Sequence, residues 1–459
     1  MATFTLTDQR DTITATSGDD TITGGTAALQ TDDTIDGAGG FDTLESGTDP
    51  NGTQAPTITG VERIMLDTAG LPFSIASVSG AERITTMGAS IVIEEVERDD
   101  LAIQFGARNV ESGTVDLRFV DGALESGTDR VRLLSDSSNV TFTSGSVFDS
   151  PGGPVNQTED AKRIEFVALE VRGSDNQVDI SDFTAIKVVT ISGDAPVVLS
   201  VDSTALEIIN ANATSGGVTV TSDIAGDQSV LGGSGSDDVK TGGGDDALYG
   251  REGDDVLNAG GGDNFVLGGA GNDEVLSEGG DDRITLGAGD DRVDSGSGND
   301  RIVAGDGADD IRAGGGDDIV NAGAGDDTAR AGGGNDYLFD GDGNDTMFGQ
   351  GGDDRFIAGA GDDTFTGGGG VDRYLFDRNA FDTDTVTDFT LTSDTRTNDV
   401  VVFDYLGERQ TLRSQSSFQE FDSENPDAFT VDDATSTITI NADGGTIILE
   451  VSDTDFFMS

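Results

Sequence analysis

An aspartate recurs every nine residues over a long stretch of the chain, and carboxylates at a fixed short spacing are suited to holding cations. From residue 232 to residue 375, sixteen consecutive nonapeptides follow the pattern G-G-x-G-x-D-x-U-x, in which U is apolar. The sixth position is asparagine once, at Asn264, and aspartate in the other fifteen units. These aspartates are Asp237, Asp246, Asp255, Asp273, Asp282, Asp291, Asp300, Asp309, Asp318, Asp327, Asp336, Asp345, Asp354, Asp363 and Asp372.

The other positions of the nonapeptide indicate a turn followed by a strand. Glycines at positions 1, 2 and 4 permit positive φ and a tight turn whose carbonyl groups face inward. The x-U-x segment predicts a very short strand with U buried and its neighbours outward. We expect two nonapeptides to form one coil with a turn and a strand on each side. The array therefore predicts a parallel β-roll of about eight coils.

The energetics of such a coil require a cation. Each coil buries only two U side chains, a core too thin to offset the entropy lost by ordering so many glycines. Position-6 carboxylates stacked coil above coil would also repel one another. Carboxylate and carbonyl oxygens are the ligands that Ca²⁺ prefers. We therefore expect several Ca²⁺ ions between adjacent turns, so that folding and metal binding are one event.

This array resembles the RTX, or hemolysin-type calcium-binding, repeat family. The resemblance implies a parallel β-roll with Ca²⁺ held in the turns, and it gives the ligand role to the fifteen position-6 aspartates. Asn264 departs from the pattern because an amide brings no charge. Position 5 is aspartate in nine units, for example Asp245, Asp254 and Asp290. We interpret these as solvated turn residues that raise the local density of negative charge.

Residues 1–48 carry a degenerate copy of the repeat. Asp-Thr-Ile or Asp-Thr-Leu phrases begin at Asp11, Asp20, Asp33 and Asp42. We expect the first coils of a solenoid here. Two interpretations stay open: calcium sites at Asp20, Asp33 or Asp42, or a capping segment without metal.

Residues 49–231 are rich in Thr, Ser and Val, in alternating runs separated by turn residues, which predicts strands rather than helices. Two closely similar phrases occupy positions 61–64 and 81–84. Their offset predicts coils of about 20 residues, an irregular parallel β-solenoid, with a β-sandwich as the alternative. The region is weakly similar to the irregular solenoid segments of RTX-bearing surface-layer proteins, where phrases such as Gly60-Val61-Glu62-Arg63-Ile64 recur.

Residues 376–459 are expected to form a small C-terminal β cap. Their beginning resembles the segment that closes RTX β-rolls in exported proteins. The last residues, Asp455-Phe456-Phe457-Met458-Ser459, resemble an uncleaved type I secretion signal. A final hairpin capping the core is the alternative. Residues 1–8 lack the basic and apolar regions of a cleavable signal, so we expect export through a type I apparatus, from a Gram-negative bacterium, to an extracellular or cell-surface location.

Composition excludes several functional classes. The chain has 459 residues, 88 acidic and 25 basic, a formal net charge of −63, and neither Cys nor His. It therefore has no disulfide framework, no thiolate or imidazole metal site and no Ser–His–Asp triad. The negative charge argues against nucleic acid and anionic lipid surfaces as partners. No apolar run reaches the roughly 18 residues of a membrane helix, so membrane insertion is not expected.

These features favour an extracellular structural protein that folds and assembles on binding Ca²⁺, as a surface-layer, filament or matrix component. It would associate with itself or with cell-surface polysaccharide. The alternative is a secreted polysaccharide-active enzyme or glycan-binding adhesin with an RTX tail. Because residues 49–231 contain no recognisable catalytic constellation, we assign no catalytic residue. An ice-binding adhesin ranks last, because the RTX arrays of such adhesins place Thr at position 3, whereas here position 3 is never Thr. A pore-forming toxin is not expected.

Overall fold

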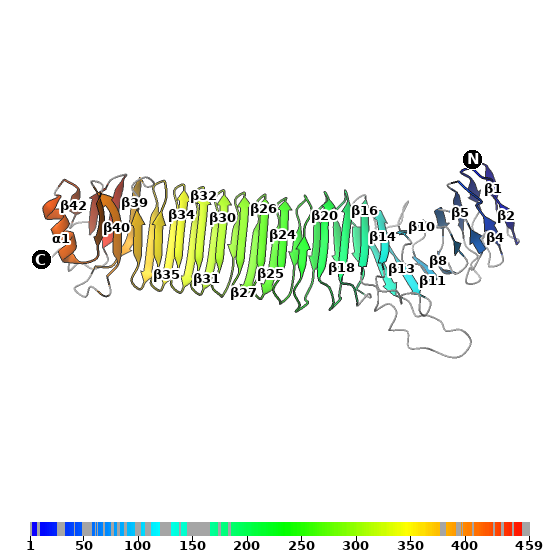
Figure 1. The fold of residues 1–459 in the computed structure, drawn as a ribbon, viewed down its shortest axis with the longest axis horizontal. Coiled ribbons are helices and arrows are strands. Elements are labelled where there is room, and N and C mark those ends of the chain that lie inside the picture. Colours follow the sequence, from blue (N-terminus) through cyan, green and yellow to red (C-terminus); the bar gives the residue numbers. More distant parts are fainter. Residues whose placement is uncertain are drawn as a thin grey trace. The chain divides into compact units, whose positions relative to one another are not determined.

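In the computed structural model the chain is almost entirely β-structure, with parallel strands stacked coil upon coil (Figure 1). The residues that the structure describes are 2–6, 10–24, 33–40, 42–47, 57–59, 61, 63–67, 69–74, 78–79, 83–86, 90–96, 102–105, 112–119, 130–136, 139–144, 166–172, 176–181, 185–376, 382–391, 396, 398–405, 408–425, 427–432, 436–442 and 445–451. The chain divides into two units, Met1–Thr241 and Gly242–Ser459. Among the described residues, no helix has the length and apolar character that a membrane crossing needs.

The first unit contains three rows of parallel strands. The first row is β1 (Thr3–Thr5), β3 (Thr21–Thr23), β5 (Thr43–Gly47), β7 (Arg63–Asp67), β10 (Arg83–Thr86), β12 (Ala102–Phe105), β14 (Arg130–Asp136), β16 (Phe166–Arg172), β18 (Val188–Gly193), β20 (Ile208–Thr214) and β22 (Ser229–Leu231). The second row is β8 (Ala69–Ser74), β11 (Ser90–Val96), β13 (Ser112–Phe119), β15 (Asn139–Ser144), β17 (Asn176–Asp179), β19 (Val197–Ser200), β21 (Val218–Thr221) and β23 (Asp238–Lys240). The third row is β2 (Thr12–Thr14), β4 (Thr34–Asp36), β6 (Thr57–Thr59) and β9 (Val78–Ser79).

Register within this unit follows the spacing of the sequence phrases. Ile64 of β7 pairs with Ile84 of β10, the equivalent residue of the next coil. Leu44 of β5 pairs with Ile64 by the same offset. The predicted coil length is confirmed for these coils, whereas Ala102 pairs with Arg132 and Arg130 with Phe166, offsets of 30 and 36 residues. The parallel pairing excludes the β-sandwich alternative.

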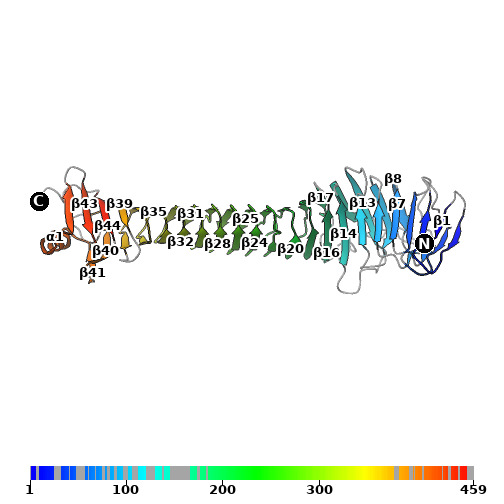
Figure 2. The same ribbon diagram turned by 90° about the horizontal axis from the view of Figure 1, so that it is seen from above.

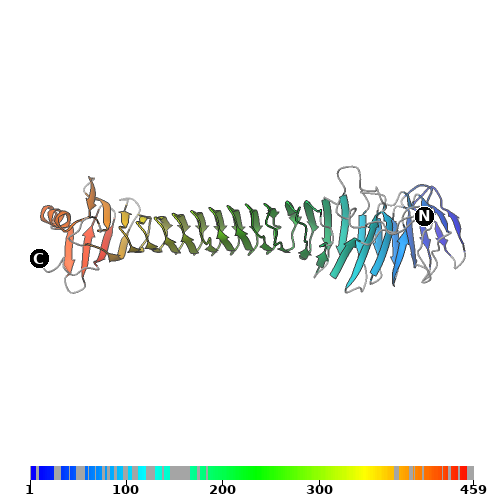
Figure 3. The same cartoon turned by 90° about the horizontal axis from the view of Figure 1, so that it is seen from below.

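The second unit stacks its strands in two rows. One row is β24 (Ala247–Glu252), β26 (Phe265–Ala270), β28 (Arg283–Ala288), β30 (Arg301–Asp306), β32 (Ile319–Ala324), β34 (Tyr337–Asp342), β36 (Arg355–Ala358), β38 (Arg373–Phe376) and β40 (Val400–Tyr405). The other is β25 (Val256–Gly261), β27 (Glu274–Gly279), β29 (Arg292–Asp294), β31 (Asp310–Gly315), β33 (Thr328–Gly333), β35 (Thr346–Gly351), β37 (Thr364–Gly369) and β39 (Thr383–Phe389). Figures 2 and 3 show these coils edge-on in green and yellow.

Pairing in the second unit confirms that one coil takes two nonapeptides. Val266 of β26 pairs with Ile284 of β28, the same repeat position two nonapeptides further along the chain. Most of the strands are six residues long, longer than the predicted x-U-x segment. Pairing continues through positions 2 and 3, as at Gly269 with Gly287 and Ala270 with Ala288, so the glycine-rich part of the repeat is itself strand.

Position 8 of the repeat forms the core, as its apolar character predicts. These side chains are at most 2% exposed, from Val239 through Leu248 and Ile302 to Tyr374. Aromatic rings fill the core near the end of the array. Phe356 stacks on Tyr374 with ring centroids 5.0 Å apart, and Phe365 meets both rings edge-on.

The C-terminal cap combines parallel and antiparallel pairing. Strand β41 (Glu408–Leu412) pairs antiparallel with β40. Strands β42 (Phe429–Asp432), β43 (Thr437–Asn441) and β44 (Thr446–Val451) form an antiparallel meander, and β44 continues the second row beside β39. The predicted final hairpin is therefore present as β43 and β44. The secretion-signal residues 455–459 lie outside the described residues.

The cap also contains a helix, α1 (Gln415–Glu424), that the strand patterns did not predict. Ser414 caps its N-terminus, and Ser417 completes the capping box in place of the usual Glu or Gln. Its buried Phe418 packs edge-on against Phe389, with ring centroids 6.0 Å apart.

Candidate metal centre

Two columns of buried carboxylates run along the second unit, one on each edge. In each column the backbone N–H of a position-6 residue donates to Oδ1 of the position-6 residue one coil later. Asp255, for example, donates to Asp273 at 2.9 Å. Ladder A contains Asp255, Asp273, Asp291, Asp309, Asp327, Asp345 and Asp363. Ladder B contains Asp246, Asn264, Asp282, Asp300, Asp318, Asp336, Asp354 and Asp372.

The second carboxylate oxygens of these ladders are buried without a protein donor. All position-6 side chains of the array are at most 3% exposed. Within the described part of the chain, Oδ2 receives no hydrogen bond in a large group of them, namely Asp273, Asp291, Asp309, Asp318, Asp327, Asp336, Asp345 and Asp354. A buried anionic oxygen without a partner is costly. The ladders therefore require either protons or cations.

Titration of these carboxylates reflects the same cost. Burial raises the pKa of Asp318 to about 7, and the charges of Asp300 and Asp336 add to this, against a backbone hydrogen bond that lowers it. Burial likewise raises the pKa of Asp291 and Asp327 to about 7. Since the ionised form is disfavoured by desolvation and by like charges, a bound cation would restore it.

The turns bring backbone carbonyl groups close to one another. Gly307, at position 4, has φ of 132°, and a Cβ added to it would lie 1.9 Å from the carbonyl oxygen of Gly289 one coil earlier. Position 1 instead faces the carboxylates. A Cβ added to Gly268 would lie 2.4 Å from Oδ2 of Asp273 in the same unit. Carboxylate and carbonyl oxygens therefore converge on each edge, a donor set that fits Ca²⁺.

Comparison with known protein families identifies the repeat. The family model of the RTX calcium-binding nonapeptide repeat matches residues 6–44 and, in overlapping segments, residues 231–374. The chain contains RTX repeats. Its RTX nonapeptides are calcium-binding motifs, so Ca²⁺ is the cation for which these oxygens are arranged. No curated protein shows significant similarity to the chain.

Asn264 keeps its place in RTX ladder B, but its side chain presents a hydrogen-bond donor, Nδ2, where the aspartates present the acceptor Oδ2. Its Oδ1 accepts from the backbone N–H of Asp246 at 3.0 Å, as the aspartates do. Its Nδ2 donates to the carbonyl of Gly262 and to Oγ of Ser277, both at 3.0 Å. A donor therefore stands where the neighbouring RTX units present an oxygen.

The RTX ladders continue beyond the array onto two aspartates that the sequence analysis did not select. Asp363 donates to Oδ1 of Asp384 at 3.0 Å, and Asp372 donates to Oδ1 of Asp399 at 2.9 Å. Burial raises the pKa of Asp384 to about 8 and that of Asp399 to about 7. Both residues begin an Asp-x-Val phrase, which is the signal that could have found them.

The first unit repeats the RTX arrangement at its N-terminal coils. Asp20, Asp33 and Asp42 are at most 1% exposed. Each accepts at Oδ1 a backbone N–H from the previous coil, as Asp42 does from Asp20 at 2.7 Å. Oδ2 of Asp20 is satisfied by Thr16, whose hydroxyl lowers the pKa of Asp20.

Asp237, the first RTX aspartate of the array, resembles Asp20 in this respect. Its Oδ1 accepts from Val218, and its Oδ2 accepts from the backbone N–H of Gly233 at 2.8 Å. The carboxylates at Asp20 and Asp237 therefore already have protein donors on both oxygens. This distinguishes them from ladder members such as Asp318 and Asp336.

Position 5 of the RTX units forms an exposed ladder of its own. The N–H of Asp263 donates to Oδ1 of Asp245 at 2.9 Å, and that of Asp281 donates to Oδ1 of Asp263 at 2.8 Å. Asparagine serves equally, since Asn272 links Asp254 and Asp290 in the same way. Position-5 side chains are thus exposed, as expected, but they also join successive coils.

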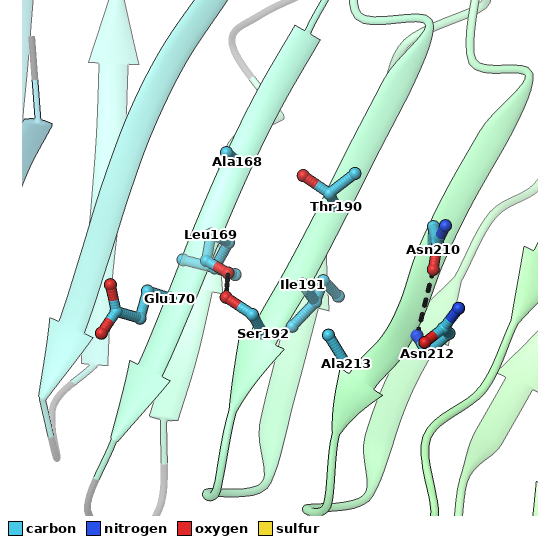
Figure 4. A pocket seen from close by; sticks show the side chains of 9 residues that line it. All are labelled: Ala168, Leu169, Glu170, Thr190, Ile191, Ser192, Asn210, Asn212 and Ala213. Atoms are coloured by element: carbon cyan, nitrogen blue, oxygen red, sulfur yellow. Dashed lines mark hydrogen bonds between the residues drawn. The ribbon is translucent and has the colours of Figure 1, made fainter.

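One groove of the first unit, about 210 Å³ in volume, is shown in Figure 4. The side chains that line it are Ala168, Leu169, Glu170, Thr190, Ile191, Ser192, Asn210, Asn212 and Ala213. Ser192 donates to the carbonyl of Leu169, and Asn212 donates to Oδ1 of Asn210. Glu170 is the sole acid in this lining, so the groove lacks the carboxylate pair that glycoside hydrolysis uses.

Proposed function

We propose that this RTX-repeat protein is an extracellular structural protein whose β-roll forms when its carboxylate ladders take up Ca²⁺. The observation that carries the proposal is the column of buried Oδ2 atoms without protein donors, such as those of Asp318 and Asp336. A chain with a net charge of −63 has few cations of its own to place there. The ligand role falls to the position-6 aspartates of the array after Asp237, and to Asp384 beyond it.

Calcium concentration would then decide where the chain folds. Sites of the extracellular class bind Ca²⁺ with Kd of roughly 10⁻⁴–10⁻³ M, above the free concentration in a cytosol. Self-repulsion would keep the chain expanded before export, and residues 376–459 would provide both the cap and the type I secretion signal. Outside the cell, Ca²⁺ would neutralise the ladders and drive folding.

Assembly into a surface layer, filament or matrix is the second part of the proposal. It is supported by the exposed position-5 carboxylates, which occur on both edges and in nine of the sixteen units, as at Asp245 and Asp263. Ca²⁺ would bridge such columns between copies, or between a copy and an acidic polysaccharide. We propose four segments for these roles: an N-terminal cap of residues 1–48, an irregular solenoid of 49–231, the β-roll of 232–375, and the C-terminal segment of 376–459.

Circular dichroism and electron microscopy of the purified chain test both parts. With chelator we expect loss of β signal, and with millimolar Ca²⁺ its recovery, whereas the same concentration of Mg²⁺ leaves the chain unfolded because Mg²⁺ requires smaller octahedral sites. Ordered sheets or fibres that appear only with Ca²⁺ support assembly. A full β signal in chelator at about pH 7.5 contradicts calcium-coupled folding, and dispersed monomers at every Ca²⁺ concentration contradict assembly alone.

Glycan binding is a second candidate function, favoured by a groove of about 380 Å³ on the second unit. Its lining is Arg301, Ile302, Ile319, Asn321, Tyr337 and Phe339. Tyr337 is 37% exposed, and the guanidinium of Arg355 lies 4.7 Å from its ring centroid. Exposed rings beside Arg and Asn suit a sugar face with its hydroxyls. Binding to a polysaccharide panel that Tyr337→Ala abolishes, with Tyr249→Ala as control, would support this function.

A further inference from the structure

One RTX unit places an acid where the others have a small or apolar residue. Position 1 is Gly, Ala, Ser, Thr or Leu in fifteen units, and it is aspartate only at Asp340. Position 1 faces Oδ2 of the position-6 aspartate of its own unit, as the clash of an added Cβ at Gly349 with Oδ2 of Asp354 demonstrates. Asp340 therefore adds a carboxylate at the point where two successive ladder carboxylates already lie.

The geometry brings three acids together. One ligand oxygen from each of Asp340, Asp345 and Asp363 lies within 4.8 Å of the others. Asp345 and Asp363 are successive members of ladder A, joined by a 2.8 Å hydrogen bond from the N–H of Asp345 to Oδ1 of Asp363. All three side chains are 1% exposed.

Two of these carboxylates direct buried oxygens without protein donors into the cluster. Oδ1 of Asp340 accepts the N–H of Gly341 at 2.6 Å. Within the described residues, Oδ2 of Asp340 and Oδ2 of Asp345 receive no hydrogen bond. The residues at position 1 one coil away on this edge are Ala322 and Ala358, which provide neither a donor nor a charge.

Among the described residues, no basic side chain forms an ion pair with this cluster. The ion pairs among the described residues involve Asp223, Glu274 and Asp310, and none reaches the three acids. The three buried carboxylates therefore lie together with no compensating charge from the described side chains.

We propose that Asp340, Asp345 and Asp363 form a three-carboxylate cation site, distinct from the repeat sites with two carboxylates, that takes up the first Ca²⁺ bound by the β-roll. This inference rests on the proposed calcium-coupled function. A third formal charge strengthens the attraction for a hard cation, so the first ion binds at least about tenfold more tightly than the rest. The same charge favours a trivalent ion such as Tb³⁺ still more strongly.

Titration calorimetry on the chelator-stripped, full-length chain tests the site, with Ca²⁺ and Tb³⁺ as separate probes. Wild type is expected to show one tight step before the remaining ions bind. Asp340→Asn and Asp340→Ala, the latter restoring the residue found in neighbouring units, should lose that step and keep the rest. Asp342→Asn removes an equal charge from an exposed position two residues away, and it should retain the tight step.

A gain-of-site variant provides an independent arm. Ala304 occupies position 1 two coils earlier, and Asp309 and Asp327 are the ladder members that correspond to Asp345 and Asp363. Ala304→Asp should therefore create a second tight step. Circular dichroism at saturating Ca²⁺ establishes that each variant folds.

The outcomes separate this inference from the function on which it rests. If Asp340→Asn binds its first ion as tightly as wild type, Asp340 is a buried neutral acid paired with Asp363 and the three-carboxylate site does not exist. In that case the other steps persist and calcium-coupled folding stands. If wild type itself binds no Ca²⁺, both proposals fail together.

Discussion

The backbone N–H of Asp372 donates to Oδ1 of Asp399 at 2.9 Å, although 27 residues separate them in sequence. Within the array the same contact always joins residues 18 apart, as between Asp354 and Asp372. On the other edge, Asp363 reaches Asp384 across 21 residues. The ladder is therefore defined by the position of the carboxylate at the start of a strand, and the length of the connection can vary.

This relationship predicts that Asp399 supports the end of the array. Its two oxygens accept the N–H groups of Asp372 and Thr390, at 2.9 and 2.7 Å. Asp399→Ala removes the acceptor of both N–H groups. This change should lower the free energy of unfolding by about 1–3 kcal/mol. Urea unfolding in saturating Ca²⁺ measures this. Asp382→Ala, at an exposed position, should change little, and equal midpoints for the two variants would contradict the role of Asp399.

Glycine at position 4 should be irreplaceable, whereas glycine at position 3 should not. Gly307→Ala forces a positive φ on alanine and drives its Cβ against the carbonyl of Gly289, so we expect a loss of about 1–3 kcal/mol. Gly315→Ala is the matched control, because nothing lies within 4 Å of its added Cβ. Thermal unfolding in Ca²⁺ should separate the two variants. Equal stability would show that the coils move apart freely.

Acid should stabilise the metal-free fold. Burial raises the pKa of Asp336 and Asp345 to about 6 and of Asp354 to about 7, from an ordinary value of 3.8. At pH values between the ordinary pKa and the raised pKa, the folded chain binds more protons than the unfolded chain. The stability of the metal-free fold therefore falls as pH rises through this range. In chelator we therefore expect β signal with a cooperative thermal transition at about pH 5, and loss of that signal at about pH 7.5.

Two controls accompany the pH measurement. High salt screens repulsion among exposed charges but acts much less on buried ones, so the acid effect should persist in it. Saturating Ca²⁺ should reverse the trend, because protons compete with the cation for Asp354 and its neighbours. A metal-free β signal that increases as pH rises would contradict the buried, cation-requiring ladders.

The aromatic end of the core gives a further prediction. Tyr374 is buried and stacks on Phe356, and within the described residues its hydroxyl has no hydrogen-bond partner. Tyr374→Phe keeps the stack and removes the unpaired hydroxyl, so stability should be unchanged or about 1 kcal/mol higher. Tyr374→Ala should cost about 3–5 kcal/mol. The midpoints of urea unfolding in Ca²⁺ measure both effects, and a marked loss of stability in Tyr374→Phe would contradict the unpaired hydroxyl.

Much of the fold could be predicted because each position of the nonapeptide has one physical task. Apolar residues such as Ile284 and Ile302 recur at the buried position, and glycines such as Gly307 recur where φ is positive. The spacing of similar phrases before the array likewise anticipated the pairing of Ile64 with Ile84. The helix α1 was missed because its capping box uses Ser417 rather than Glu or Gln.

The site was less predictable, because the residue type at one position does not reveal which neighbouring groups donate hydrogen bonds to its side chain. Asp237 and Asp318 match the same pattern, yet Gly233 donates to Oδ2 of the first and nothing described donates to Oδ2 of the second. Asp384 and Asp399 lie beyond the last nonapeptide of the array, and Asp384 is also out of its nine-residue phase. Asp340 lay inside that phase, at a position whose orientation toward the carboxylates only the folded turn reveals.

The constant offset between successive coils of the array has a consequence for how the β-roll can grow. Each coil closes a loop of the same short length, so the entropy of loop closure and the contact order do not increase with the number of coils. A duplication or deletion of two whole nonapeptides, such as Gly250–Leu267, would leave both ladders in register. A change of a single nonapeptide would exchange every later carboxylate between the two edges, from Asp273 to Asp399. The length of this protein can therefore change by whole coils, at little cost to the rate at which it folds.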